Sequence, residues 1–301
     1  MLHKVIWQKP ASYNDICLQY VNYVIHNYNK DSVIVFDGYT KEVTPTKESL
    51  QRCRSKGSTE ISINAQASVI IPQEDFLRNS QNKTQFINIL RTYFEDVGIT
   101  VNQATRDADY LITTTAVELS ILKKHVTVVS EDTDIMVLLI HHSKNKNISM
   151  LRPGKAAKGD KVSTISEIQD KLGHLKKHIL FLHAISGCDT TSYLFNKSKR
   201  TCLALLKEDI DLSQNLDIFL NSNASKNDLL QSGLNFILRL YRCPKHIKDI
   251  NLLRYTLCHR TASRQGLQST FNLATLPPTE DSVQQHVLRT YFQVLPTNFK
   301  K

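Results

Sequence analysis

The sequence predicts an α/β protein, in which a mainly parallel central sheet carries flanking helices and is followed by a helical C-terminal region. Two observations predict this class. Short apolar stretches of strand length alternate with segments of helical periodicity, as in folds that cover both faces of a parallel sheet with helices. From residue 165 onward the pattern is mostly helical. The sheet is therefore expected in the first half of the chain.

The first expected elements come before residue 60. Residues 16–28 carry aromatic and aliphatic side chains at the spacing of a helix. The stretch VIVF at 33–36 has the composition of a short buried strand, and it ends at Asp37-Gly38. The segment KESLQRCRSK at 47–56 then predicts a helix rich in basic residues.

A second group of elements follows. Residues 82–97 predict an amphipathic helix whose apolar face holds Phe86, Ile87, Leu90 and Phe94. Residues 99–101 predict a strand, and residues 107–122 predict the next helix. These elements repeat the alternation of strand and helix that indicates a parallel sheet.

Two more strands complete the expected sheet. The stretch VTVV at 126–129 precedes a cluster of acids, and residues 148–151 form another apolar stretch. Residues 143–161, rich in Lys, Asn and Gly, are typical of an exposed loop or hairpin. We expect a first domain over residues 1–200 and a helical region over residues 201–301.

Composition and charge narrow the function classes. The 301 residues carry a formal net charge of +10, which favours a polyanionic partner. The longest aliphatic run is too short for a membrane span, and the N-terminus lacks the apolar core of a secretory signal. The six cysteines show no paired spacing. We therefore expect a nuclear or cytoplasmic protein that is not secreted and has no membrane partner.

Although the chain is basic overall, its acidic residues cluster in a few short segments. Residues 128–139 read VVSEDTDIMVLL, so that Glu131, Asp132 and Asp134 follow a strand, as Asp37 does. Strand ends at the carboxyl edge of a parallel sheet are where such folds build their sites. Asp107 and Asp109 begin a helix, and Asp189 lies in SGCDTTS. Each acid alone is more often a helix cap than a ligand.

Several carboxylates that converge need a cation, because neighbouring negative charges otherwise repel one another or take up protons. Clusters of oxygen ligands suit Mg²⁺ or Mn²⁺. Two such ions about 4 Å apart can activate water and stabilise the leaving oxygen of a phosphodiester. The basic remainder of the chain would then hold the backbone of a nucleic acid.

Four motifs occur in the order FDG, RDADYLI, SEDTDIMVL and SGCDTTS. This order resembles the flap-endonuclease branch of the PIN-like nucleases, and within it a poorly characterised set of animal proteins. The resemblance covers roughly residues 33–206, and it implies that residues 1–200 form a PIN-like nuclease domain with a mainly parallel central sheet and flanking helices. It implies a metal-dependent nuclease that acts on DNA or RNA with two Mg²⁺ or Mn²⁺ ions, and it leaves open whether this nuclease is specific for nucleic-acid structure.

The resemblance also assigns roles to residues. It implies that the catalytic acids are Asp37, Asp107, Asp109, Asp132, Asp134 and Asp189. It implies that the metal ligands are Asp107, Asp109, Glu131, Asp132, Asp134 and Asp189. The basic helix after Asp-Gly and the segment FNKSKRTCLALL would contact phosphates through Lys47, Arg52, Arg54, Lys197, Lys199 and Arg200.

The sequence departs from the family pattern in two places. The family begins with a strand that carries a further metal-site Asp, whereas here a helical segment containing Asp15 precedes VIVF. The family's glycine-rich hairpin after the Gly-Cys-Asp motif lacks its glycines here. The alternative hypothesis is therefore a catalytically inactive protein that binds nucleic acid or a partner and keeps the acids as a relic.

Overall fold

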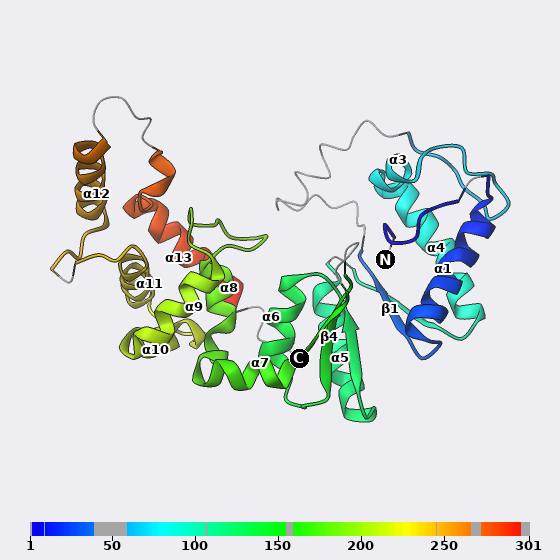
Figure 1. The fold of residues 1–301 in the computed structure, drawn as a ribbon, viewed down its shortest axis with the longest axis horizontal. Helices are drawn as coiled ribbons and strands as arrows, with labels where there is room; N and C mark the ends of the chain where they lie inside the picture. Colours follow the sequence, from blue (N-terminus) through cyan, green and yellow to red (C-terminus); the bar gives the residue numbers. More distant parts are fainter. Residues whose placement is uncertain are drawn as a thin grey trace. The chain divides into compact units, whose positions relative to one another are not determined.

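The computed structural model describes residues 2–8, 10–38, 59–105, 107–154, 159–244, 246–265 and 272–295. The chain divides into two compact units, Met1–Ile112 and Thr113–Lys301 (Figure 1). The division falls inside one continuous helix, α5 (Asp109–Leu122). This division concerns packing alone, and the expected extent of the nuclease-like domain stays a prediction.

The first unit pairs two short strands. Strand β1 (Val33–Phe36) runs parallel to β2 (Thr100–Gln103), with Val33 opposite Thr100 and Phe36 opposite Gln103. Gly38 follows β1, where an added Cβ would lie 2.3 Å from the carbonyl carbon of Thr105. Only glycine permits this approach, which brings the end of β1 against the chain that leads into α5.

Three helices complete the described part of this unit: α1 (Tyr13–Tyr28), α3 (Gln73–Arg78) and α4 (Ser80–Asp96). Their core is aromatic, because Trp7, Phe76 and Phe86 lie with ring centroids 5.2–6.1 Å apart. Helix α1 confirms the expected helix before VIVF. Asp15 completes its capping box by accepting from the Ser12 backbone at 2.9 Å, so this acid has a structural use.

The second unit holds the other sheet. Strand β3 (Val126–Val129) runs parallel to β4 (Ile148–Arg152), and β4 pairs antiparallel with β5 (Lys161–Thr164). Helix α6 (Thr133–His142) follows β3. In Figure 1, α6 lies beside β4.

The rest of the second unit is helical. Helix α8 (Ile179–Ile185) lies at its centre, since six of its seven residues are buried, and it packs against α6 and α13. The rings of Phe181, Phe219 and Phe236 form the middle of this core. The remaining helices are α7 (Ile165–Leu172), α9 (Lys199–Glu208), α10 (Ile210–Asn215), α11 (Lys226–Leu240), α12 (Ile250–Gln265) and α13 (Glu280–Val294), with short 3-10 segments at Gly173–His178, Leu216–Leu220 and Leu273–Thr275.

The α/β class is confirmed, whereas a single central sheet is not found in the described residues. They form one sheet of two strands and another of three, with β5 antiparallel. An apolar stretch indicates that a strand forms, but its partner is decided by packing that the sequence pattern does not contain. The expected basic helix at 47–56 lies outside the described residues. No helix among those described is long and apolar enough to cross a membrane.

Candidate metal centre

The acids of VVSEDTDIMVLL lie where β3 ends and α6 begins. Asp132 has extended backbone angles, and its Oδ1 accepts a hydrogen bond from the Asp134 backbone N–H at 2.8 Å. The Ser130 hydroxyl oxygen accepts from the Asp132 backbone N–H at 3.0 Å. Asp132 is therefore the N-cap of α6, a position that favours a carboxylate. The cap uses one of its oxygens.

Helix α5 begins with the same Asp-x-Asp arrangement. Asp107 Oδ1 accepts from the Asp109 backbone N–H at 3.4 Å, as Asp132 does from Asp134. Asp37 Oδ1 accepts from the Ala108 backbone N–H at 3.2 Å. Asp37 and Asp107 both accept hydrogen bonds from backbone N–H groups at the start of α5. Stabilising the start of a helix is the structural role that such acids usually have.

Three of the predicted acids come together. Asp109, Asp132 and Asp134 each offer a carboxylate oxygen, and these oxygens all lie within 4.8 Å of one another. Asp109 is the first residue of α5, and the other two begin α6. The positive ends of both helices reduce the repulsion among these charges, but they do not cancel it. This cluster of three carboxylates, here called the acidic triad, could hold a metal ion.

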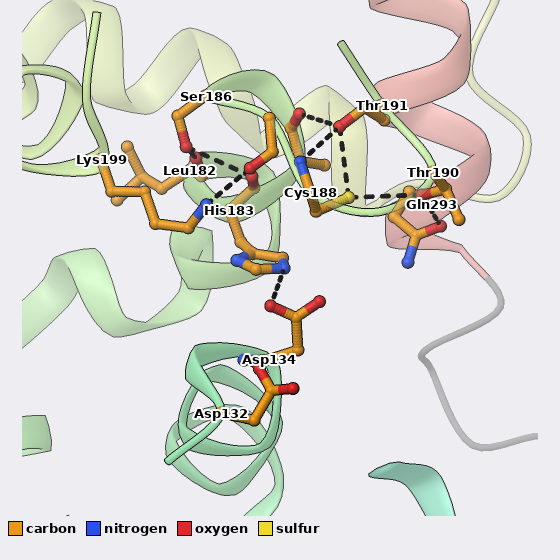
Figure 2. Close-up of polar contacts among 12 residues, drawn as sticks. Asp132, Asp134, Leu182, His183, Ser186, Cys188, Thr190, Thr191, Lys199 and Gln293 are labelled. Carbon is orange, nitrogen blue, oxygen red and sulfur yellow. Dashed lines mark hydrogen bonds and ion pairs between the residues drawn. The ribbon is translucent and has the colours of Figure 1, made fainter. Parts of the chain in front are cut away.

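Asp134 has a partner that the sequence did not indicate. The Nε2 atom of His183, on α8, lies 3.3 Å from Asp134 Oδ1 (Figure 2). The hydrogen bond from His183 lowers the pKa of Asp134 more strongly than partial burial raises it, and the charges of His183 and Lys199 lower it further. Asp134 is thus held in its ionised form, which is the form that binds cations.

His183 responds in the opposite direction. Burial by itself would lower the pKa of this imidazole, since only 7% of the residue is exposed. Its interactions with the Asp134 carboxylate and the Cys188 thiol outweigh burial and raise the pKa to about 9. His183 therefore carries its positive charge at neutral pH and forms an ion pair with Asp134.

The loop after α8 surrounds this pair. The Lys199 ammonium donates to the Gly187 carbonyl at 2.6 Å, which fixes the start of α9 to the loop (Figure 2). Cys188 Sγ lies 3.3 Å from the Thr190 hydroxyl and 3.2 Å from the Thr191 hydroxyl. Burial would raise the pKa of this thiol, whereas interactions with His183 and both hydroxyls lower it to about 6.

Gly187 determines the course of this loop. Its φ is +103°, and an added Cβ would lie 2.7 Å from Tyr193 Cα. Both observations require glycine. The loop then makes a tight turn in which the Thr191 N–H donates to the Cys188 carbonyl at 3.3 Å. Asp189 is exposed on this turn and is not a member of the acidic triad.

The other predicted residues have different surroundings. Glu131 is exposed between β3 and α6, and within the described parts of the chain it lies outside the triad, as do Asp37 and Asp107. Lys197 Nζ lies 4.5 Å from the centre of the Tyr241 ring, while Arg200 is exposed on α9. The structure does not describe Lys47, Arg52 or Arg54, whose phosphate contacts stay a prediction.

Comparisons with known proteins do not identify this site. No protein-family model matches the chain, and no curated protein matches it. The functional conclusion below therefore depends on the geometry of the site and on the resemblance of the four motifs.

Proposed function

We propose that the chain is a metal-dependent nuclease that hydrolyses phosphodiester bonds in DNA or RNA, with Mg²⁺ or Mn²⁺ held by the acidic triad. The observation that carries this proposal is the approach of three carboxylates within 4.8 Å of one another in a chain with a net charge of +10. Clusters that contain only oxygen ligands suit these two ions.

Each carboxylate of the triad can offer one oxygen to a metal ion. Asp132 gives one oxygen to the cap of α6 and Asp134 gives one to His183, so each side chain has a second oxygen for an ion. Asp109 supplies the third carboxylate from the start of α5. A bound divalent ion supplies Lewis-acid polarisation of a phosphodiester and activation of water.

Basic residues next to the triad fit a polyanionic substrate. The charge of Lys199 lowers the pKa of Asp134, which places its ammonium within electrostatic reach of that carboxylate. Arg200, the next residue, is exposed at the start of α9. Both can contact phosphates that enter the site, as the family resemblance implies, and such contacts recognise backbone rather than base sequence.

The proposed second ion needs ligands beyond the triad. The resemblance implies Asp189 for this site, together with Asp107 and Glu131. Asp189 is exposed on the turn after Gly187, and its side chain is accessible to an ion or a substrate. Asp37 and Asp107 already accept hydrogen bonds from the start of α5, so their proposed catalytic roles require an additional contact.

A second candidate function is a nucleic-acid-binding protein without catalysis. The observation in its favour is the structural use of Asp37 and Asp107, which bind backbone N–H groups at the start of α5. Acids with a capping role persist in a fold after catalysis is lost, because the helix still needs them.

One experiment separates the two candidates. Single-stranded, duplex and branched DNA and RNA are incubated with the full chain and Mg²⁺ or Mn²⁺, and the products are resolved by length. The nuclease proposal expects cleavage that EDTA stops and that Asp132→Asn abolishes, with Asp217→Asn as an active control. Binding of these substrates without cleavage, together with a melting temperature that does not respond to either ion, would establish the inactive protein.

A further inference from the structure

We infer that His183 is a positioning residue of the metal centre, which holds the Asp134 carboxylate in the orientation that binds the ion. This inference rests on the proposed function and deepens it. The resemblance of the four motifs assigns no role to this histidine, and His183 donates no ligand to the acidic triad. It acts through Asp134.

The contact has the geometry of an orienting bond. His183 Nε2 lies 3.3 Å from Asp134 Oδ1, and Figure 2 shows the second carboxylate oxygen directed away from the ring. A carboxylate on a helix rotates about two side-chain bonds, and a bond to one oxygen fixes both rotations. The remaining oxygen is then presented in one direction before the ion arrives.

The ring itself is well anchored. Helix α8 is the centre of the core of its unit, and the residues on both sides of His183, Leu182 and Ala184, are buried. The ring therefore has little freedom to follow a moving carboxylate. A rigid donor on a core helix and an acceptor on α6 fix the start of α6 relative to α8.

The polar chemistry of the ring points to the same role. Within the described residues, His183 Nδ1 is buried and has no hydrogen-bond partner, whereas Nε2 contacts the Asp134 carboxylate. If this side chain only filled space, an apolar residue would be more stable here, because burying the imidazole nitrogens costs free energy of desolvation. Contact with a metal-site carboxylate is a reason for a histidine at this place.

The chain provides a matched control. His178 is fully buried, and its Nε2 also lies 3.3 Å from an aspartate oxygen, Oδ1 of Asp217. Asp217 is not a member of the acidic triad, and it also accepts from Lys177 Nζ at 2.7 Å. Substitution of His178 therefore removes a buried imidazole and an aspartate contact without touching the metal centre.

The test measures Mn²⁺ affinity of the full chain by electron paramagnetic resonance. Three variants are compared with the parent: His183→Gln, whose amide nitrogen reaches about as far as Nε2; His183→Asn, which is polar but too short; and His183→Leu, which is apolar. His178→Leu is the control. Circular dichroism establishes that each variant is folded.

We expect His183→Asn and His183→Leu to raise the Kd for Mn²⁺ by about 10–100-fold, the usual cost of removing a group that orients a ligand. His183→Gln should stay within a few-fold of the parent, and His178→Leu should be unchanged. In cleavage assays, excess Mn²⁺ should restore the rate of the weakened variants, which a damaged fold would not allow. His183→Gln and His183→Asn decide the outcome if the leucine variant does not fold.

Three results would overturn the inference. Folded His183→Asn with parental affinity would show that the ring does not orient Asp134, while the proposed function would stand. Equal weakening by His183→Gln and His183→Asn would show that the shape of the ring matters and the donor does not. A parent chain that binds no Mn²⁺ would overturn both this inference and the proposed function.

Discussion

Two buried histidines of the second unit have the same separation from a carboxylate and opposite properties. His183 Nε2 and His178 Nε2 each lie 3.3 Å from an aspartate oxygen. Burial lowers the pKa of His178 to about 4, although Asp217 opposes this shift. The pKa of His183 reaches about 9 in spite of burial.

The difference comes from the partners of each aspartate. Asp217 lies half-exposed and forms a 2.6 Å ion pair with Lys177, so its charge is shared and is partly screened by water. Neither ring nitrogen of His178 makes a hydrogen bond in the described structure. Asp134 is less exposed and bonds to His183, with Cys188 as a further partner of the ring. Distance alone therefore does not define an ion pair; alignment and competing charges decide it.

The largest expected effect separates the two aspartates by activity. Asp134→Asn should reduce cleavage by more than about 100-fold, since removing a ligand costs at least as much as removing a group that supports one. Asp217→Asn should leave the rate unchanged, because Asp217 lies outside the acidic triad. Initial rates at saturating Mn²⁺ measure both. A fast Asp134→Asn variant would break the proposed link between the triad and catalysis.

A second expectation compares the two neighbours Asp132 and Asp134 by stability. Asp132→Asn should be neutral or slightly stabilising without metal, because Asn also caps helices and one repelling charge is lost. Asp134→Asn should lower the free energy of unfolding by about 1–3 kcal/mol, because it weakens the bond to a buried charged imidazole. Urea unfolding in EDTA measures both values. Equal stability of the two variants would show that the His183 pair contributes nothing to folding.

The pH dependence of unfolding distinguishes the histidines. The folded-state pKa of His183, about 9, exceeds the ordinary 6.5, so its pair stabilises the metal-free fold fully below pH 6.5 and loses this contribution as the pH rises through 9. His178, with a folded-state pKa of about 4, makes the fold less stable as the pH falls from 6.5 toward 4. Each contribution is on the order of 3 kcal/mol.

Variants assign these two slopes. His183→Leu should flatten the alkaline side of the stability curve and His178→Leu the acidic side, as measured by denaturant unfolding across the pH range. If both variants flatten the same side, the contrast between the two histidines is wrong.

Thiol labelling sharpens the comparison further. Burial raises the pKa of Cys17 to about 12 and that of Cys202 to about 11, whereas the surroundings of Cys188 lower its pKa to about 6. Iodoacetamide should therefore modify Cys188 before Cys17 and Cys202 at neutral pH, because the thiolate is the nucleophile. His183→Leu should slow this reaction, and His178→Leu should not. Peptide mass spectrometry after timed quenching follows each cysteine.

The smallest expected effect concerns salt. Arg200→Ala should flatten the dependence of duplex DNA affinity on salt by about 1, since one phosphate contact contributes a slope of roughly 0.9. Arg52→Ala with Arg54→Ala should flatten it by about 1 to 2, similarly for all sequences. Fluorescence anisotropy across a salt series measures these slopes. Unchanged slopes would identify both basic segments as solvated surface.

The sequence predicted the strands and part of the site for identifiable reasons. VIVF and VTVV are apolar and bounded by acids, and they coincide with β1 and β3. Asp109, Asp132 and Asp134 could be expected together because they lie at the ends of elements. The sequence could not show that β1 and β3 belong to different sheets, because four-residue strands carry little information about their partners.

The pairing of His183 with Asp134 could not be predicted from the sequence either. His183 lies within an apolar helical segment, ILFLHAI, where a histidine is usually a buried core residue. Its distance along the chain from Asp134 gives no periodic signal, and the sequence gives no reason to prefer it to the nearby His178, which follows Lys176 and Lys177. Only the packing of α8 against α6 selects which of the two histidines meets a triad carboxylate.

The repeated Asp-x-Asp start of α5 and α6 has an evolutionary consequence. Asp107 and Asp132 each accept a backbone hydrogen bond at the start of a helix, and Asp132, the N-cap of α6, is also part of the triad. Asparagine performs the first task as well as aspartate does and cannot supply the second charge. Under the proposed function, a lineage that changes from Asp to Asn at position 132 would keep its folded shape while losing a metal ligand. Cleavage would then be lost in one substitution, without loss of the fold.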